Sequence, residues 1–202
     1  MTGGWIKTAA AAAALCAVTA PCAPAYAVEQ TPPYRSDDLG VSFDVPAGYE
    51  EETPAPAPGS TTRVLRLFWA DGPYAGLEFL ITARNVTYET PVIAAGLYQR
   101  RRGIDKAFEA RAGLLTEEDL ARIGAQDGVR VDYITKGEEP RRVTALFLTV
   151  NGTLYRVEVF RPIAPEGDTS EPIRSFERSL RIHPGQDNNT PEGGAEAPLE
   201  NE

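Results

Sequence analysis

The sequence predicts an α+β fold built on a central, mainly antiparallel β-sheet. The clearest observation is the stretch 141–161, where two long apolar-rich runs are joined by Asn151-Gly152, a dipeptide typical of a two-residue hairpin turn. A second pair of apolar runs, 63–70 and 77–84, flanks a turn that contains glycine and proline. Between the two pairs, apolar residues recur at helical spacing, so at least one helix accompanies the sheet.

The register of the hairpin at 141–161 follows from its two-residue turn, which places Leu148 opposite Tyr155. Because side chains alternate between the two faces of a strand, the residues sort into two sets. One set is apolar enough to form a core face: Thr144, Leu146, Leu148, Val150, Thr153, Tyr155, Val157 and Val159. The other set mixes apolar with charged residues, and we expect it to be only partly covered: Val143, Ala145, Phe147, Thr149, Leu154, Arg156, Glu158 and Phe160.

Residues 1–27 have the features of a secretory signal peptide. They contain one cation, Lys7, an alanine-rich apolar run at 9–20 and the small-residue pattern Ala25-Tyr26-Ala27, which are the three parts of such a signal. We therefore expect cleavage after Ala27 and a periplasmic or secreted mature chain. The apolar run is shorter than the ~20 residues that span a bilayer, so no transmembrane segment is expected in the mature chain.

Both cysteines, Cys16 and Cys22, lie inside this signal. Leu15 and Pro21 precede them, whereas a lipoprotein signal requires a small residue there, so lipidation is not expected. The mature chain would then contain no cysteine, and neither a disulfide nor thiolate chemistry.

The net charge of the chain is −9, and much of it lies near the C-terminus. Residues 184–202 include five acids and no base, and their composition cannot bury a core, so a disordered acidic tail is predicted. The acidic balance disfavours nucleic acid as a partner, because phosphate neutralisation requires a basic surface. Arginine outnumbers lysine 17 to 3, which, with the many alanines, suggests a GC-rich bacterial source.

Elements before the central hairpin are predicted in order. At 40–49, Val41, Phe43 and Val45 alternate with polar residues, which predicts a strand ended by Pro46. The acidic, proline-rich stretch 50–61 follows as a loop. The runs 63–70 and 77–84 then form a hairpin. Three residues of its first strand share one face: Leu65, Leu67 and Trp69.

A helix is predicted from about 91 to 110, with Thr90 as its N-cap and Pro91 at its first position. Gly103 is a position where it could break. Its apolar side is predicted from four residues at helical spacing: Ile93, Leu97, Ile104 and Phe108.

The stretch 116–124 is ambiguous. Thr116 with Asp119 could cap a turn of helix. Pairing of 121–124 with the alternating strand at 128–135 instead gives a hairpin, which we favour.

After the central hairpin, Ser170-Glu171-Pro172 opens a short helix. Its inward residues would be Ile173 and Phe176. Leu180 and Ile182 then alternate as a last strand.

In this order the elements resemble PsbP-like domains. Tyr34-x-Ser36 followed by GVSFDVPAGY is similar to the opening of that family, with Tyr49 where the family commonly has tryptophan. The strand pair around IGAQDGVRVDY, the long hairpin and the closing Phe176-x-x-Ser179-Leu180-x-Ile182 are similar as well. The resemblance covers 34–183.

This resemblance implies an α/β/α sandwich around a central antiparallel sheet, the fold shared by photosystem accessory proteins, the Mog nuclear-import factor and DcrB-type envelope proteins. It also implies an accessory or binding protein without catalysis. No catalytic or metal-binding motif of the family can be placed on this sequence.

No residue pattern names a reaction. His183 is the sole histidine, and without a cysteine in the mature chain it cannot form the usual zinc sites. A Ser-His-Asp triad would have to use His183, but no G-x-S-x-G motif accompanies it. Acid–base chemistry would have to use carboxylates such as Asp44, Asp132 and Glu158, although alternation favours outward-facing polarity for all three. The acid runs at 37–38, 50–52 and 117–119 lack the spacing of a calcium loop. We expect no catalytic residue, no cofactor and no metal site.

Two interaction surfaces are predicted. The half-polar hairpin face offers a partner surface of Phe147, Leu154, Arg156 and Phe160, with the proline-rich loop at 54–58 as the alternative contact surface. A basic cluster for an anion or an acidic partner is formed by Arg100, Arg101 and Arg102. The alternative for the cluster is a helix end whose cations complement the macrodipole.

The sequence therefore favours an exported, non-catalytic binding or accessory protein of the periplasm or cell envelope, expected as a monomer, whose partner is an unknown envelope protein. One alternative is a carboxylate-based hydrolase acting on envelope glycans. The other is a soluble small-ligand carrier, which would need a deep apolar cavity between helix and sheet.

Overall fold

The structure is a computed structural model that describes residues 32–102, 111–136, 138–164 and 167–183. The strands in these ranges are β1 (Tyr34–Ser36), β2 (Val41–Phe43), β3 (Glu50–Glu52), β4 (Arg63–Phe68), β5 (Glu78–Asn85), β6 (Arg111–Leu114), β7 (Asp127–Ile134), β8 (Arg141–Val150), β9 (Thr153–Pro162) and β10 (Arg181–Ile182). The helices are α1 (Pro91–Arg101), α2 (Glu117–Ile123), α3 (Ser170–Ser179) and the short 3-10 helix η1 (Gly72–Tyr74).

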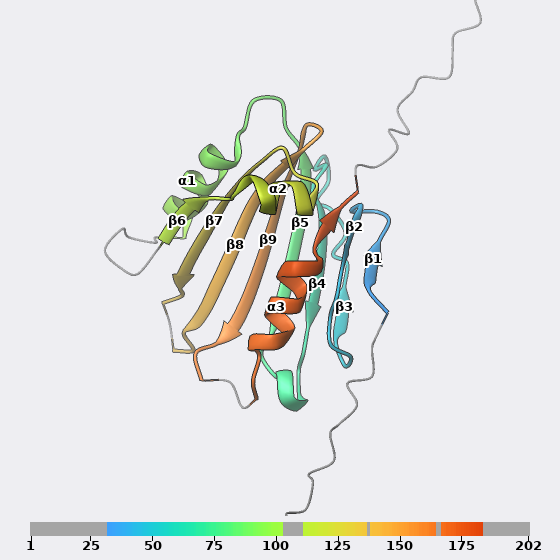
Figure 1. Cartoon of the computed structure of the whole chain (residues 1–202), viewed down its shortest axis with the longest axis vertical. Coiled ribbons are helices and arrows are strands. Elements are labelled where there is room, and N and C mark those ends of the chain that lie inside the picture. Colours follow the sequence, from blue (N-terminus) through green and yellow to red (C-terminus); the bar gives the residue numbers. More distant parts are fainter. Residues whose placement is uncertain (1–31, 103–110, 137, 165–166, 184–202) are drawn as a thin grey trace, which may run out of the picture. The chain divides into compact units, whose positions relative to one another are not determined.

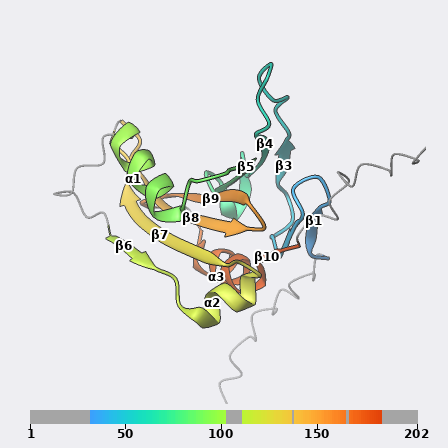
Figure 2. The same cartoon turned by 90° about the horizontal axis from the view of Figure 1, so that it is seen from above.

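Seven of these strands form one antiparallel sheet in the order β3-β4-β5-β9-β8-β7-β6, and β1-β2-β10 form a small second sheet. Helix α1 covers one face of the large sheet, whereas α2 and α3 lie on the other face (Figures 1 and 2). The α+β class and the arrangement of helices around an antiparallel sheet are thus confirmed.

The central hairpin has the predicted register. Leu148 pairs with Tyr155, and Val150 pairs with Thr153 across the turn. Asn151 and Gly152 both have positive φ, 47° and 75°, which is the backbone of the turn that matches the twist of two strands. Since β8 and β9 occupy the middle of the large sheet, this local turn sets the register of its centre.

The face of the sheet opposite α1 holds the larger core, centred on aromatic side chains. Phe176 of α3 stacks on Phe79 at 4.4 Å between ring centroids and meets Phe43 at 4.9 Å. All three rings are completely buried. The predicted inward residues of α3 and the predicted last strand are confirmed, since Ile173, Phe176, Leu180 and Ile182 are buried.

The first predicted hairpin and the first predicted strand are confirmed as well. β4 pairs with β5 across the turn that contains η1. The residues predicted to face inward are all buried: Val41, Phe43, Val45, Leu65, Leu67 and Trp69. The predicted loop at 50–61 contains one strand, β3, whose three glutamates are exposed at the edge of the sheet.

Helix α1 begins as predicted but buries a different side. The Thr90 side chain accepts a hydrogen bond from the Ile93 backbone N–H, yet Ile93 and Leu97 are 50% and 40% exposed. Its buried residues are Pro91, Ala94, Ala95 and Tyr98. The prediction was wrong because it followed hydrophobicity alone, whereas small alanines allow the helix to approach the sheet closely. Ile104 and Phe108 lie outside the described residues.

The favoured hairpin, in which 121–124 pairs with 128–135, is wrong, because residues 117–123 form helix α2. Thr116 Oγ1 accepts from the Asp119 backbone N–H at 3.1 Å, and Gly124 ends the helix in the left-handed conformation at φ 88°. Three acids in the first turn add a favourable interaction with the helix dipole. The strand that pairs with β7 is instead β6.

Within the described ranges, none of the helices is both long and apolar enough to cross a membrane.

Replacing Phe176 with alanine tests the packing of α3 on the sheet. The substitution removes a buried ring that contacts Phe79 and Phe43, so we expect the free energy of unfolding to fall by about 3–5 kcal/mol in urea denaturation. The control is Arg174→Ala on the same helix, whose ion pair with Glu171 is exposed and should contribute about 1 kcal/mol or less. Equal effects of the two substitutions would contradict the packing described.

Candidate functional site

A buried carboxylate lies between α1 and the sheet. Glu158 of β9 has no exposed surface, and its Oε1 accepts a hydrogen bond of 2.5 Å from the Tyr98 hydroxyl of α1. The Tyr98 hydroxyl also contacts the Tyr133 hydroxyl of β7. Since Tyr98 donates its only proton to Glu158, Tyr133 is the donor in the second bond. The helix is therefore tied to two strands by a chain of polar groups.

The two tyrosines hydrogen-bonded in this buried cluster, Tyr98 and Tyr133, stay protonated. Burial raises the pKa of Tyr98 far above its usual range, and the charge of Glu158 and the hydrogen bond to it act in the same direction. Burial likewise raises the pKa of Tyr133. Both hydroxyls are therefore neutral hydrogen-bond donors at neutral pH.

Arg156 supplies the positive charge next to Glu158. Its Nε lies 2.8 Å from Glu158 Oε2, but the two groups do not have hydrogen-bond geometry, so the contact is an ion pair. Arg102 Nη2 lies 3.9 Å from Glu158 Oε1. Both guanidiniums flank the Tyr98 ring, at 5.5 Å for Arg156 and 5.6 Å for Arg102 from its centroid. The buried negative charge is thus compensated from two sides.

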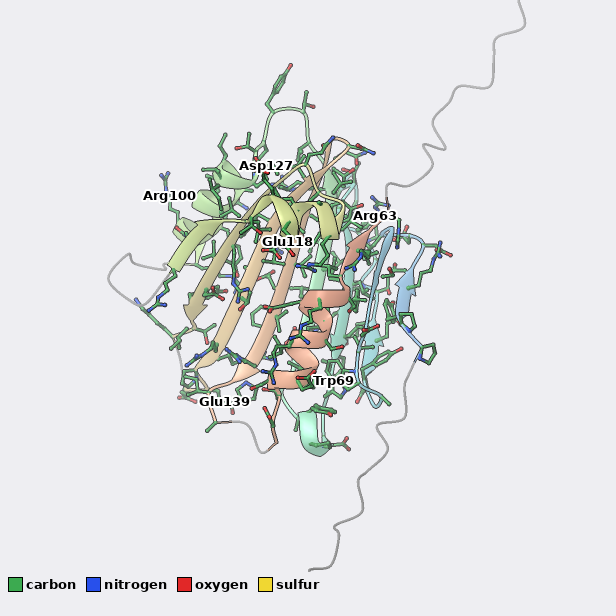
Figure 3. All side chains as sticks on the ribbon, viewed as in Figure 1. Arg63, Trp69, Arg100, Glu118, Asp127 and Glu139 are labelled. Carbon is green, nitrogen blue, oxygen red and sulfur yellow. The ribbon has the colours of Figure 1, made fainter. Side chains whose placement is uncertain are left out.

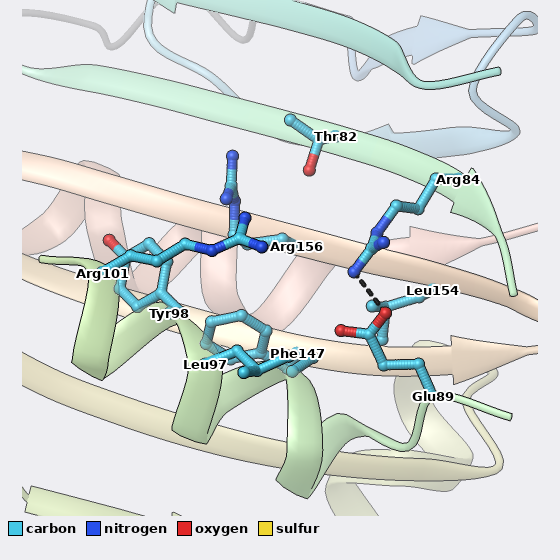
Figure 4. Close-up of a pocket in the computed structure, with 10 residues that line it drawn as sticks. Thr82, Arg84, Glu89, Leu97, Tyr98, Arg101, Phe147, Leu154 and Arg156 are labelled. Carbon is cyan, nitrogen blue, oxygen red and sulfur yellow. Dashed lines mark hydrogen bonds and ion pairs between the residues drawn. The ribbon is translucent and has the colours of Figure 1, made fainter. Parts of the chain in front are cut away.

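A small pocket opens beside this cluster, between α1 and the sheet (Figure 4). Its volume is about 80 Å³, well below the ~300–1,000 Å³ of small-molecule sites. The pocket therefore suits one functional group of a larger partner. Its lining combines polar with apolar side chains: Thr82, Arg84, Glu89, Ala94, Leu97, Tyr98, Arg101, Phe147, Leu154 and Arg156.

Three guanidiniums border the pocket from three elements: Arg84 from β5, Arg101 from α1 and Arg156 from β9 (Figure 4). Arg84 pairs with Glu89 at 2.6 Å, and Arg156 pairs with Glu158. Arg101 is exposed and has no carboxylate within ion-pair distance among the described residues. The excess positive charge beside apolar walls can hold a carboxylate whose neighbouring carbons are apolar.

The predicted partner surface is largely covered. Phe147, Leu154 and Phe160 are only 2%, 3% and 8% exposed, because α1 packs on this face and the Arg141 guanidinium lies 5.0 Å from the centre of the Phe160 ring. The expectation that this face is only partly covered is therefore wrong at Phe147, Leu154 and Phe160. Phe147, Leu154 and Arg156 nevertheless line the pocket.

The predicted basic cluster separates into three positions. Arg100 lies on the outer side of α1 (Figure 3). Arg101 borders the pocket, and Arg102 reaches Glu158. Arg101 of this cluster and three residues of the predicted partner surface therefore meet at the pocket: Phe147, Leu154 and Arg156. Sequence reasoning did not single out five other lining residues: Thr82, Arg84, Glu89, Leu97 and Tyr98. The one available signal was the pair of opposite charges at Arg84, near the end of β5, and Glu89, in the loop before α1.

The three candidate catalytic carboxylates do not share a site. Glu158 lies under α1, whereas Asp132 lies on the opposite face, where it accepts hydrogen bonds from Arg130 and from the Thr144 hydroxyl. Asp44 follows β2 and meets Ser175 of α3. The expectation that Glu158 points outward is wrong, since it is fully buried. No two of these acids flank a common cleft as glycoside hydrolysis requires.

His183 is exposed, and its Nε2 lies 2.8 Å from the Ser42 hydroxyl. Over the part of the chain that the structure describes, no three histidine, cysteine or acidic side chains gather in a way that could hold a metal ion.

The fold can be compared with known proteins. No protein-family model and no curated protein sequence matches the chain. Among solved structures, the chain is similar to cyanobacterial PsbP (CyanoP) from Synechocystis, with a TM-score of 0.53 and 11% identity over 82% of this chain and 99% of that one. The fold is PsbP-like. At this identity the likeness concerns the fold alone.

The chain also matches a crystal structure from Bacteroides thetaiotaomicron with a TM-score of 0.47 and 13% identity. The match covers 76% of this chain and 49% of the other, so the chain spans about half the length of that protein.

Replacing Glu158 with glutamine tests the buried cluster. The amide can still accept from Tyr98, but the partly exposed Arg156 loses its counter-charge, so we expect the free energy of unfolding to fall by about 1–3 kcal/mol. The control is Glu171→Gln, which removes an exposed ion pair and should change stability by about 1 kcal/mol or less. Thermal and urea denaturation measure both. A Glu158→Gln protein as stable as the control would exclude the proposed role of the ion pair.

Proposed function

We propose that the chain is exported, cleaved after Ala27, and acts in the periplasm or cell envelope as a non-catalytic accessory protein that binds a partner protein through α1. In this proposal, residues 34–183 form the PsbP-like domain and 184–202 a disordered acidic tail. The PsbP-like fold supports an accessory role. The observation that carries the proposal is the exposed apolar side of α1 next to the arginine-bordered pocket.

The outer side of α1 bears Val92, Ile93 and Leu97, which are 56%, 50% and 40% exposed. Gly96 lies among them, and a Cβ at this position would meet no atom within 4 Å. Glycine at an exposed helix position costs about 1 kcal/mol relative to alanine, and no contact inside the domain requires it. A backbone left bare between apolar side chains permits close approach of another chain.

The pocket completes this surface, since Leu97 and Arg101 belong to its border. A partner segment that places apolar side chains against Ile93 and Leu97 can direct a carboxylate toward Arg101 and Arg156. The partner is therefore expected to present an acidic residue flanked by apolar ones. Such a mixture of an apolar centre and a charged border is common in protein interfaces.

Replacing Gly96 with glutamine tests the interface without disturbing the fold. The longer side chain has free space in the isolated protein and favours the helix, so stability should stay equal or rise. It should obstruct a partner on α1 and reduce its capture from native envelope extracts by at least about tenfold, equivalent to about 1.4 kcal/mol. Quantitative mass spectrometry of the captured proteins measures the loss.

Leu97→Asp should cause the same loss through charge, whereas Ile163→Asp is the matched control, since Ile163 is 46% exposed and lies after β9. A partner retained by both α1 variants would refute α1 as the interface. A partner lost with Ile163→Asp as well would show that the capture was non-specific.

Export is tested separately. Expression of the full chain in a Gram-negative host should give a periplasmic product whose N-terminus is Val28, determined by N-terminal sequencing of the osmotic-shock fraction. An uncleaved product confined to the cytoplasm would contradict this part of the proposal.

A further inference from the structure

A second basic site lies on the opposite face of the large sheet from α1. Four arginines from four neighbouring strands border an open groove of about 480 Å³: Arg111 of β6, Arg130 of β7, Arg142 of β8 and Arg161 of β9. We call this the arginine groove. Asp132, Tyr133 and Ile134 complete its lining.

The strand register brings these charges together. Arg142 lies directly opposite Arg161 in the β8–β9 pair, and Arg111 lies opposite Asp132 in the β6–β7 pair. Like charges placed opposite one another on neighbouring strands destabilise a sheet. The hairpin turn fixes this register, so the two arginines cannot separate by a shift of the strands.

The groove contains more positive charge than its own acids compensate. Arg130 is paired, at 2.8 Å with Asp132 and at 3.2 Å with Glu177. Within the described ranges, Arg111, Arg142 and Arg161 have no carboxylate within ion-pair distance. Three guanidiniums therefore have no ion pair, and the four arginines together with Asp132 and Glu177 carry a net positive charge of two, in a chain whose net charge is −9.

The environment of Arg161 reflects this excess. Burial, followed by the neighbouring charge of Arg142, lowers the pKa of Arg161 from its usual value, although the group remains charged. A partly buried guanidinium next to another guanidinium is stabilised by any anion that reaches both.

We propose that the arginine groove binds a phosphate group. A carboxylate offers two oxygens and one charge, too few for three guanidiniums. A phosphate group offers three or more oxygens and up to two charges, and guanidinium forks bind its oxygens in pairs. Strands lie about 4.8 Å apart, so arginines on adjacent strands can hold one group between them. A terminal phosphate of this kind belongs either to a soluble phosphate compound or to the headgroup of phosphatidic acid.

This site is independent of the proposed partner interface, because the two lie on opposite faces of the sheet. Arg156 and Arg161 illustrate the separation, since both belong to β9 but differ by an odd number of positions.

The test compares the parent protein with Arg142→Gln/Arg161→Gln. Inorganic pyrophosphate is the soluble probe, and its binding is measured by calorimetry at about 150 mM salt. Vesicles of phosphatidic acid and phosphatidylcholine are the lipid probe, and their binding is measured by cosedimentation. Removing two opposed like charges should not lower the melting temperature, so the variant is expected to fold. We expect the parent to bind at least one probe and the variant to bind it at least tenfold more weakly.

The matched control is Arg35→Gln/Arg100→Gln, which removes the same charge at two exposed positions and should bind as the parent does. Binding of pyrophosphate alone supports a soluble phosphate compound as the ligand. Binding of vesicles, with or without pyrophosphate, supports a lipid headgroup. Binding of neither probe by the parent, or equal binding by the groove variant, would overturn the proposal, as would an equal loss in the control.

Discussion

The buried carboxylate of Glu158 is the constraint on which the α1 side of the molecule depends. A charge without solvent contact must be compensated by nearby partners. These are the adjacent Arg156, Tyr98 on α1 and Arg102 at the C-terminal cap of α1. The helix can supply them only if its Tyr98 side faces the sheet. The orientation of α1 about its axis is thus determined by a polar interaction rather than by its most apolar side.

This orientation leaves Ile93 and Leu97 in contact with solvent, and it places Arg101 at the border of the pocket. The same side chains turned inward would enlarge the core but leave Glu158 without its hydroxyl donor. The exposed apolar side of α1 and the pocket next to it are therefore consequences of one buried charge. The opposite face of the sheet contains the larger apolar core, to which α3 contributes, and the arginine groove.

Much of the sheet could be predicted because its signals are local. Asn151-Gly152 alone determines the register of β8 and β9, and alternation identifies the buried side of β2, β4 and β7. Helices α1 and α2 show where local reasoning fails. Spacing assigned Ile93 and Leu97 to the core because a sequence does not reveal that Glu158 is buried beneath the helix. At 121–124, strand pairing was favoured over a helix that begins at the Thr116 cap, although this cap and Gly124 determine helix α2.

The candidate site was predicted in fragments for the same reason. Arg101 was selected for its charge and Phe147, Leu154 and Arg156 for their shared face, but only the packing of α1 on the sheet brings them together. Thr82, Arg84 and Glu89 come from a different part of the chain and have no motif. The arginine groove was likewise not recognised, although the predicted register already places Arg142 opposite Arg161.

The three glutamates of β3 have a consequence for self-association. β3 is the outer strand at one end of the large sheet, where unpaired backbone groups could accept a strand from another molecule. A second copy that added its own β3 there would set three carboxylates against three. Electrostatic repulsion between identical edges thus opposes growth of the sheet from one molecule to the next. A strand without this negative charge would not meet the same repulsion at β3.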